Sequence, residues 1–347
     1  MKRILYILII SFFAGQMLFA GNPDRQGEAG AAELLLNPWA KSAGLHTMGT
    51  SFISGVEAMR LNPAGIGRIT GREVSFGNTR LYEGAGISLN SLGYAQRVGK
   101  NGAFGVSLVQ TDFGEIPITT SDQPEGTGGF FSPGFFNMGV GYSYTYENKI
   151  SVGILFRGIS ESLPNLTAFG FAIDAGVQYV SGEKDNFKLG ISLRNIGSPM
   201  QFSGEGLAIK SDNPIAEIGF QQKFDSRAQD FELPSVLNIG ASYDVYFTEE
   251  VFLRVLGNFT SNAFSRDQVG GGAEIQFKNL ITLRGGYKYE VGSTAGDKEN
   301  LYTGIAAGAT INVPISKDGG TKIAIDYAYR TTDPFRGTHN IGIRASF

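Results

Sequence analysis

The 347-residue sequence contains no cysteine, only two histidines and a single tryptophan. Without cysteine the chain cannot form a disulfide framework, a thiolate metal site or a cysteine nucleophile. It also has no cysteine that could be lipidated, as lipoproteins require. His46 and His339 lie far apart in the chain, which excludes a histidine-rich metal site. The sequence therefore predicts neither a metal centre nor a cofactor.

Neither sign of charge is in large excess, because the chain has 29 basic and 32 acidic residues and a formal net charge of −3. Such a balance argues against a nucleic-acid partner.

Two short motifs could suggest chemistry. Gly270 to Gly272 falls in an expected strand with no helix after it to bind a phosphate, and Ser181 to Lys184 falls in an expected turn. Because no nucleophile can be placed beside a base, we predict that the protein is not an enzyme.

Long apolar runs are absent beyond residue 20. The start of the chain has a basic Lys2-Arg3 pair, an apolar stretch over 4–14 and small residues at Ala20 and Gly21. This order is typical of a secretory signal peptide, which we place at 1–20. The alternative is a membrane anchor helix, but the apolar stretch is shorter than the roughly 20 residues that a span needs.

Glycine and aromatic residues are abundant, with 49 glycines, 26 phenylalanines and 14 tyrosines. From about residue 72 onward, apolar and polar residues alternate with a period of two, as in the sequence FFNMGVGYSYTY at 135–146. This period indicates β-strands with two different faces. Fourteen strands are predicted, near 72–80, 86–98, 102–111, 134–146, 150–158, 169–181, 187–196, 234–247, 250–260, 268–278, 280–290, 301–313, 321–331 and 338–347.

The two faces of these strands distinguish a soluble protein from a membrane protein. The apolar rows carry no charge, whereas the opposite rows carry many, and such rows cannot line a dry core. We therefore predict an all-β fold, a transmembrane antiparallel barrel with a wet or plugged lumen, over a secreted β-sandwich. Asp326 and Arg330 are expected to form an ion pair there. The predicted polar row of the lumen contains Arg157, Asp174, Arg194, Glu274, Arg284, Asp326, Arg330 and Arg344.

The connections between predicted strands alternate in length. Long outer loops are expected at 112–133 and 197–233, with a further longer connection at 158–168, as in outer-membrane barrels. Residues 21–71 lack the alternation and are predicted to form an N-terminal hatch, so that 72–347 form the barrel. A phase change within 86–98 predicts a β-bulge near Asn90 and Ser91. The last strand ends at Phe347, which is typical of the closing signal of bacterial outer-membrane barrels.

Asn62-Pro63-Ala64-Gly65 resembles the Asn-Pro-Ala signature of the FadL-like outer-membrane family. In that family the signature lies in a hatch that plugs a fourteen-stranded barrel. The segments 29–44, 55–65, 193–210 and 231–244 together resemble the PorV/PorQ family of the type IX secretion system. The resemblance implies a location in the bacterial outer membrane, in contact with its lipid. It also implies a secretion translocon or secreted proteins as partners.

Two functions of different classes follow. The first is a non-enzymatic role in type IX secretion, in which the barrel binds the translocon or the C-terminal domains of cargo. The alternative is the transport of a hydrophobic small molecule past the hatch, with Asn62 to Gly65 as a gating element. The alternative predicts an apolar pocket between the hatch and the barrel wall. A simple diffusion porin is a third possibility, which the predicted hatch disfavours.

Overall fold

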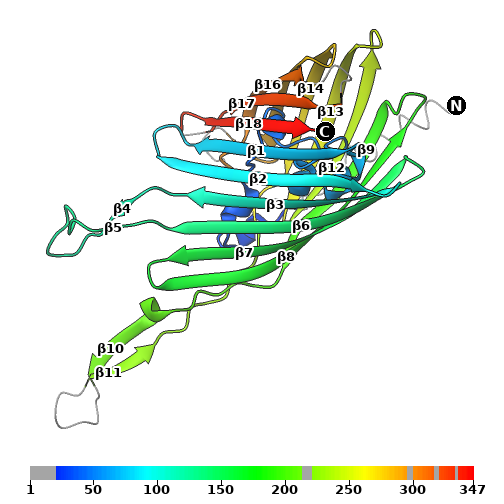
Figure 1. Cartoon of the computed structure of the whole chain (residues 1–347). Coiled ribbons are helices and arrows are strands. Elements are labelled where there is room, and N and C mark those ends of the chain that lie inside the picture. The colour runs from blue at the N-terminus through cyan, green and yellow to red at the C-terminus, as the bar shows by residue number, and fades with distance from the viewer. Residues whose placement is uncertain (1–20, 213–220, 295–299, 316–319, 333–334) are drawn as a thin grey trace.

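A computed structural model describes residues 21–212, 221–294, 300–315, 320–332 and 335–347. Fourteen antiparallel strands close into one barrel, and neighbours in the barrel are neighbours in the chain (Figure 1). The predicted fold class is therefore confirmed, and the sandwich alternative is wrong. The barrel strands are β1 (Arg72–Leu81), β2 (Ile87–Val98), β3 (Gly102–Asp112), β6 (Gly134–Tyr146), β7 (Ile150–Leu163), β8 (Leu166–Ser181), β9 (Phe187–Gly197), β12 (Val236–Tyr246), β13 (Val251–Asn262), β14 (Gln268–Phe277), β15 (Ile281–Glu290), β16 (Gly304–Pro314), β17 (Lys322–Arg330) and β18 (Thr338–Ser346).

The barrel closes where the last strand meets the first. β18 pairs with β1 from Arg80–His339 to Glu73–Ser346. Beyond this ladder, the Phe347 and Arg72 backbones exchange hydrogen bonds of 2.9 and 3.0 Å. The Phe347 side chain itself is exposed. A closed sheet leaves no unpaired edge strand, which is the condition for a sheet to cross a bilayer.

Two details of the predicted wall are wrong. The longer connection at 158–168 does not exist. β7 continues to Leu163, β8 begins at Leu166, and a two-residue turn joins them. The bulge near Asn90 and Ser91 is also absent, since β2 pairs continuously with both neighbours. The apolar Leu89 simply points inward, where it is fully buried. The register shift lies instead between β8 and β9, next to Asp174.

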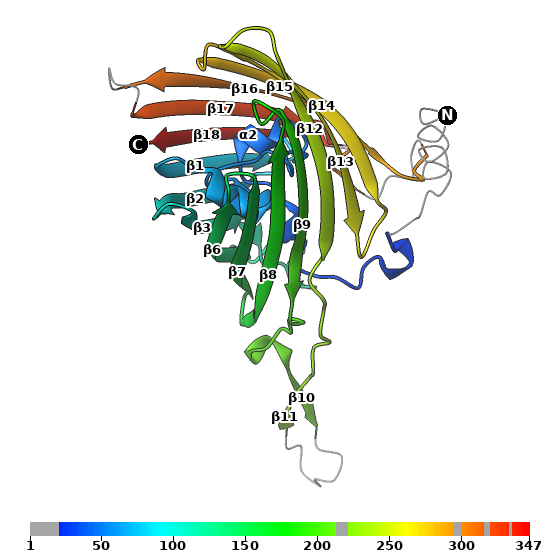
Figure 2. The same cartoon turned by 90° about the vertical axis from the view of Figure 1, so that its right-hand side faces the viewer.

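Two short hairpins lie in the long connections. One consists of β4 (Ile116–Pro117) and β5 (Phe130–Phe131), and the other of β10 (Ala208–Asp212) and β11 (Gln221–Asp225). The second hairpin projects well away from the barrel (Figure 2). Both lie at the end of the barrel that carries the 112–133 and 197–233 connections, which we call the loop end. The opposite end, with connections such as 99–101 and 147–149, is the turn end.

The residues before β1 pass through the barrel interior from the loop end to the turn end. They form short helical turns, and Figure 2 shows α2 inside the barrel. At the turn end, Arg68 donates hydrogen bonds to the backbone oxygens of Asn148 and Lys149, at 2.7 and 2.8 Å. No helix in the described residues is both long and apolar enough to cross a membrane. The helices are η1 (Pro23–Arg25), η2 (Ala32–Leu35), α2 (Ala40–Ala43), α3 (Ala58–Leu61), η3 (Pro63–Arg68) and η4 (Glu205–Leu207).

The outer surface of the barrel is apolar. From Ile150 to Arg157 on β7 and from Ala168 to Val180 on β8, the residues alternate strictly between exposed and buried. The exposed positions are apolar, including Ile154, Phe156, Phe171 and Ile173. A belt of exposed apolar side chains around a closed barrel is the surface that lipid covers in membrane barrels.

Candidate functional site

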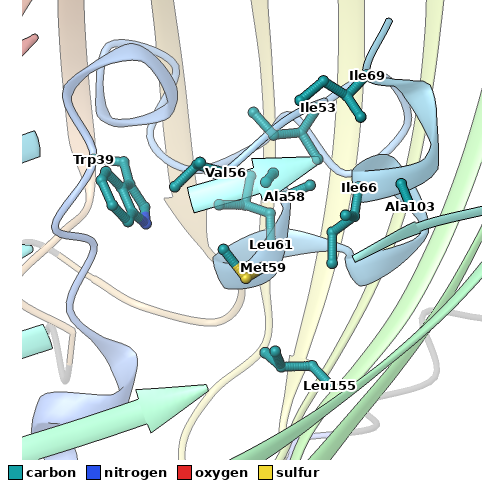
Figure 3. Close-up of a cluster of buried hydrophobic side chains, with 11 residues drawn as sticks. Trp39, Ile53, Val56, Ala58, Met59, Leu61, Ile66, Ile69, Ala103 and Leu155 are labelled. Atoms are coloured by element: carbon teal, nitrogen blue, oxygen red, sulfur yellow. The ribbon is translucent and has the colours of Figure 1, made fainter. Parts of the chain in front are cut away.

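The lumen is filled mainly by residues 37–69, which we call the lumen segment. Its core is an apolar cluster that contains Trp39, Ile53, Met59 and Ile66, together with Leu155 from the wall (Figure 3). Trp39 is 2% exposed and is the only tryptophan of the chain. Burial of large apolar side chains, each contributing about 1.5–3 kcal/mol, holds the lumen segment in place.

Asn62 connects the lumen segment to two wall strands. Its Oδ1 accepts a hydrogen bond from the Ala64 backbone at 3.1 Å and so begins η3. Its Nδ2 lies 2.9 Å from the Thr50 carbonyl, 3.1 Å from the Val177 carbonyl of β8 and 3.3 Å from the Ile191 carbonyl of β9. The side chain is fully buried, so these contacts replace water completely.

Glycines in the wall let the lumen segment approach the strands closely. A Cβ at Gly176 would meet Oδ1 of Asn62, and one at Gly153 would meet the Pro63 carbonyl. Within the motif, a Cβ at Gly65 would meet the Ile53 carbonyl and would lie 2.8 Å from the Ala58 Cβ. The Asn62-Pro63-Ala64-Gly65 motif is therefore a tight contact between the lumen segment and β7 and β8.

The residues predicted for the polar row of the lumen point inward and form separate clusters. In the first, Asp174 accepts a hydrogen bond from Arg157 Nη2 at 2.6 Å and lies 3.8 Å from Arg194 Nε. In the second, Glu274 bridges Arg254 and Arg284, each at 3.0 Å. Arg254 also pairs with Asp244 at 2.7 Å. Ion pairs buried in this way satisfy charges that could not line a dry interior alone.

One predicted pair is wrong. Asp326 does not pair with Arg330 but lies 3.6 Å from Arg344 Nη2, and it also accepts a hydrogen bond from Thr310. Residues four apart on one strand share a face, but they lie too far apart along it for a direct contact. Arg330 instead lies over the Tyr302 ring, with Cζ 4.1 Å from the ring centroid.

The chain before the lumen segment lies at the loop end. Ala31 and Leu34 are buried there in an apolar cluster with wall residues such as Phe135, whereas residues 23–30 are held by exposed contacts. Arg25 pairs with Glu232 at 2.8 Å and lies over the Phe264 ring at 4.4 Å. Ala29 forms an isolated parallel bridge with Glu232, and the Gly30 amide donates to the Glu232 carbonyl at 3.0 Å. These contacts are exposed, whereas the hydrogen bonds of the Asn62 side chain are buried. We call residues 23–36 the rim segment.

An uncharged pocket of about 150 Å³ lies between the rim segment and the barrel wall. Gly30, Ala32 and Leu35 line it from the rim segment, and Val236 and Phe264 are among the residues that line it from the wall. We call it the rim pocket. Its volume equals that of an apolar cavity that can hold benzene. Four polar residues also line it: Ser235, Asn262, Ser265 and Asn300.

Several residues of the interior escaped the sequence reasoning. Glu57 accepts a hydrogen bond from the Ser42 amide at 2.9 Å, and Glu73 from the Val56 amide at 2.7 Å. Arg60 donates through Nε to the Leu36 carbonyl at 2.8 Å. Glu57 and Arg60 lie in a segment without periodicity, which gave no signal of burial, whereas the alternation along β1 could have placed Glu73 on the inward face. Only the place of Glu57 and Arg60 beside the Asn-Pro-Ala signature could have drawn attention to these two.

No protein-family model matches the sequence, and no curated protein matches it. Solved structures do match. The toluene transporter TodX of Pseudomonas putida has a TM-score of 0.56 at 16% identity, over 89% of this chain and 97% of that one. The toluene transporter TbuX of Ralstonia pickettii has 0.56 at 14%, over 88% and 97%. A FadL homologue of Pseudomonas aeruginosa has 0.54 at 12%, over 89% and 98%.

At these identities the likeness concerns the fold. It gives no support to membership of the PorV/PorQ family, to type IX secretion or to a translocon partner. The predicted FadL-like architecture agrees with it, as do the fourteen strands and the apolar exterior. The chain thus has the FadL-like fold of a fourteen-stranded bacterial outer-membrane β-barrel.

Proposed function

We propose that the protein carries small hydrophobic molecules across the outer membrane, with the rim pocket as the place where they first bind. The observation that carries this proposal is the uncharged pocket between the rim segment and the wall. Its position is the one that the transport alternative predicts. Its volume of about 150 Å³ suits a monoaromatic hydrocarbon.

Two further observations support this proposal over the secretion role. Solved structures of the same fold include toluene transporters. Residues 23–30 of the rim segment are held by exposed contacts and lie outside the buried apolar clusters, so they can move without disturbing the core around Trp39. Segments with few buried contacts open at low free-energy cost. In this proposal, the predicted hatch of residues 21–71 opens at its rim segment, which admits the ligand, while the lumen segment stays in place.

The test is uptake of radiolabelled toluene by Gram-negative cells that lack their own transporter and express this chain. Ala32 is exposed and lines the rim pocket, so Ala32→Phe fills it. Gln26→Phe is the matched control, because Gln26 is exposed on the same segment but does not line the pocket. We expect uptake above the empty-vector level, lost in Ala32→Phe and kept in Gln26→Phe. Uptake no faster than in empty-vector cells would contradict the proposal.

A further inference from the structure

A second cavity, of about 90 Å³, lies deeper in the barrel, between the lumen segment and the wall. We call it the lumen cavity. Arg60 and His46 line it from the lumen segment, and Arg194, Lys288 and Arg330 line it from the wall. Among the described residues, no aspartate or glutamate lines it. The remaining lining is mostly neutral amide and hydroxyl groups, such as Asn238 and Tyr302.

Most cationic groups around this cavity have no carboxylate partner among the described residues, unlike those elsewhere in the lumen. Arg330 is 2% exposed, and its Nε and Nη2 have no hydrogen-bond partner. Nη1 of Arg60 and Nε2 of the buried His46 are also unpartnered. Within the described part of the chain, neither Arg60, Lys288 nor Arg330 forms an ion pair. Arg194 differs from these three, because its Nε lies 3.8 Å from Asp174.

Carboxylates close to the cavity are already engaged. Glu290 lies two residues from Lys288 on β15, but it does not line the cavity, and it accepts a hydrogen bond from the Asn300 amide at 3.1 Å. Asp174 accepts from Arg157 and from the Asn195 amide. Burying several cations together without counter-charge is unfavourable, because each loses hydration and they repel one another. This arrangement is stabilised if an anion occupies the cavity.

We propose that the lumen cavity is a binding site for a compact polyvalent oxyanion of the phosphate type. Guanidinium groups donate paired hydrogen bonds that match the oxygens of such anions, and a lysine adds a point charge. Three basic side chains that form no ion pair with any described residue surround one cavity, which favours an anion with more than one charge. The volume also fits, since one water needs about 10–15 Å³ by this measure and the cavity offers about 90 Å³.

This site goes beyond the proposed transport of hydrophobic molecules and does not depend on it. The rim pocket is uncharged, whereas the lumen cavity is cationic, although their linings share Leu35, Val236, Asn262 and Asn300. The bound oxyanion would join the lumen segment, through Arg60, to β15 and β17, through Lys288 and Arg330. Occupancy therefore stabilises the seating of the lumen segment.

The test is isothermal titration of the full-length protein, purified from the outer membrane in a non-ionic detergent, with inorganic phosphate at constant chloride. We expect one saturable site. Arg330→Gln and Lys288→Gln should each weaken it by roughly tenfold or more, because a charge-assisted hydrogen bond is lost. Lys188→Gln is the matched control, since Lys188 faces the lumen but pairs with Asp244 outside this cavity. It should bind as the wild type does.

Arg330→Lys keeps the charge and should retain binding, which distinguishes loss of charge from loss of fold. Heat-modifiable gel mobility verifies that each variant is a folded barrel. If free phosphate does not bind saturably, or binds equally to the two glutamine variants, the proposal is wrong. Two other ligands test the alternatives. If dihexanoyl phosphatidic acid binds and free phosphate does not, the site recognises lipid headgroups. If only octanoate binds, the site recognises monocarboxylates, and either result would overturn the proposal.

Discussion

Nδ2 of Asn62 lies 3.1 Å from the Val177 carbonyl oxygen, and this contact joins the lumen segment to β8. Asn62→Asp keeps an acceptor for the Ala64 amide but replaces the donor with a carboxylate oxygen that faces three carbonyls. Each unsatisfied buried group costs about 1–3 kcal/mol. We expect the lumen segment to loosen, with faster amide exchange over 50–66 and stronger quenching of Trp39 by acrylamide. Asn165→Asp, in the exposed turn between β7 and β8, is the control and should change neither. Unchanged exchange in Asn62→Asp would show that this anchor is not needed.

Gly176 makes a second prediction about the same contact. A Cβ there would meet Oδ1 of Asn62 and would lie 3.2 Å from the Pro63 Cδ, so Gly176→Ala overpacks the interface. Overpacking costs typically about 1–3 kcal/mol. The control is Gly158→Ala on β7, where the nearest atom, of Phe169, lies 3.8 Å away. Thermal unfolding followed by Trp39 fluorescence should show a lower midpoint for Gly176→Ala only. Equal midpoints would mean that the lumen segment shifts without cost.

The wall of the barrel could be predicted from the sequence because each strand faces two different environments. Lipid outside and a polar lumen inside impose a period of two, which can be recognised in one strand without knowing its neighbours. The ends of the strands were harder to predict. The turn at 164–165 was missed because 158–168 does not keep a clear apolar row, yet β7 and β8 extend through it. Leu89 suggested a bulge, since the sequence could not show that an apolar cluster fills part of the lumen.

The interior could be predicted only in outline. Which residues point inward follows from periodicity, but which charges meet depends on the stagger between strands. Asp326 therefore pairs with Arg344 on the neighbouring strand instead of Arg330 on its own strand. The lumen segment has no period at all, so the burial of Arg60, Glu57 and His46 was beyond sequence reasoning. The rim pocket follows from tertiary contacts between segments that are more than 200 residues apart, such as Gly30 and Glu232.

Asp174 should be among the most sensitive charges in the wall. It holds Arg157 at 2.6 Å and lies 3.8 Å from Arg194, with all three side chains buried. Asp174→Asn leaves two buried guanidinium groups without counter-charge, which costs about 3–5 kcal/mol. Asp185→Asn breaks an exposed pair with Lys149 and should cost at most about 1 kcal/mol. Urea unfolding followed by Trp39 fluorescence measures both, and similar midpoints for the two variants would contradict this account of the lumen.

His46 predicts a pH dependence. Burial lowers the pKa of its imidazole to about 3, and the nearby charges of Lys288 and Arg330 add to the effect. Between about pH 3 and pH 6.5 the unfolded chain binds a proton here that the folded chain does not, so stability falls as the pH falls, by up to about 1.4 kcal/mol per pH unit. His46→Gln cannot gain that proton and should lose less stability on acidification. The heat-induced mobility shift, measured from neutral to acidic pH, should separate the two proteins; parallel curves would contradict the lowered pKa.

Opening of the rim segment is the central claim, and the absence of cysteine allows a direct test. Ala29 and Glu232 are paired in a parallel bridge, so a disulfide between Ala29→Cys and Glu232→Cys has suitable geometry to fix the rim segment. The measurement is uptake of radiolabelled toluene by cells with the double variant, before and after a reductant, with each single variant as a control. We predict that uptake stops in the oxidised double variant and returns on reduction. Undiminished uptake through the cross-linked barrel would contradict a route past the rim segment.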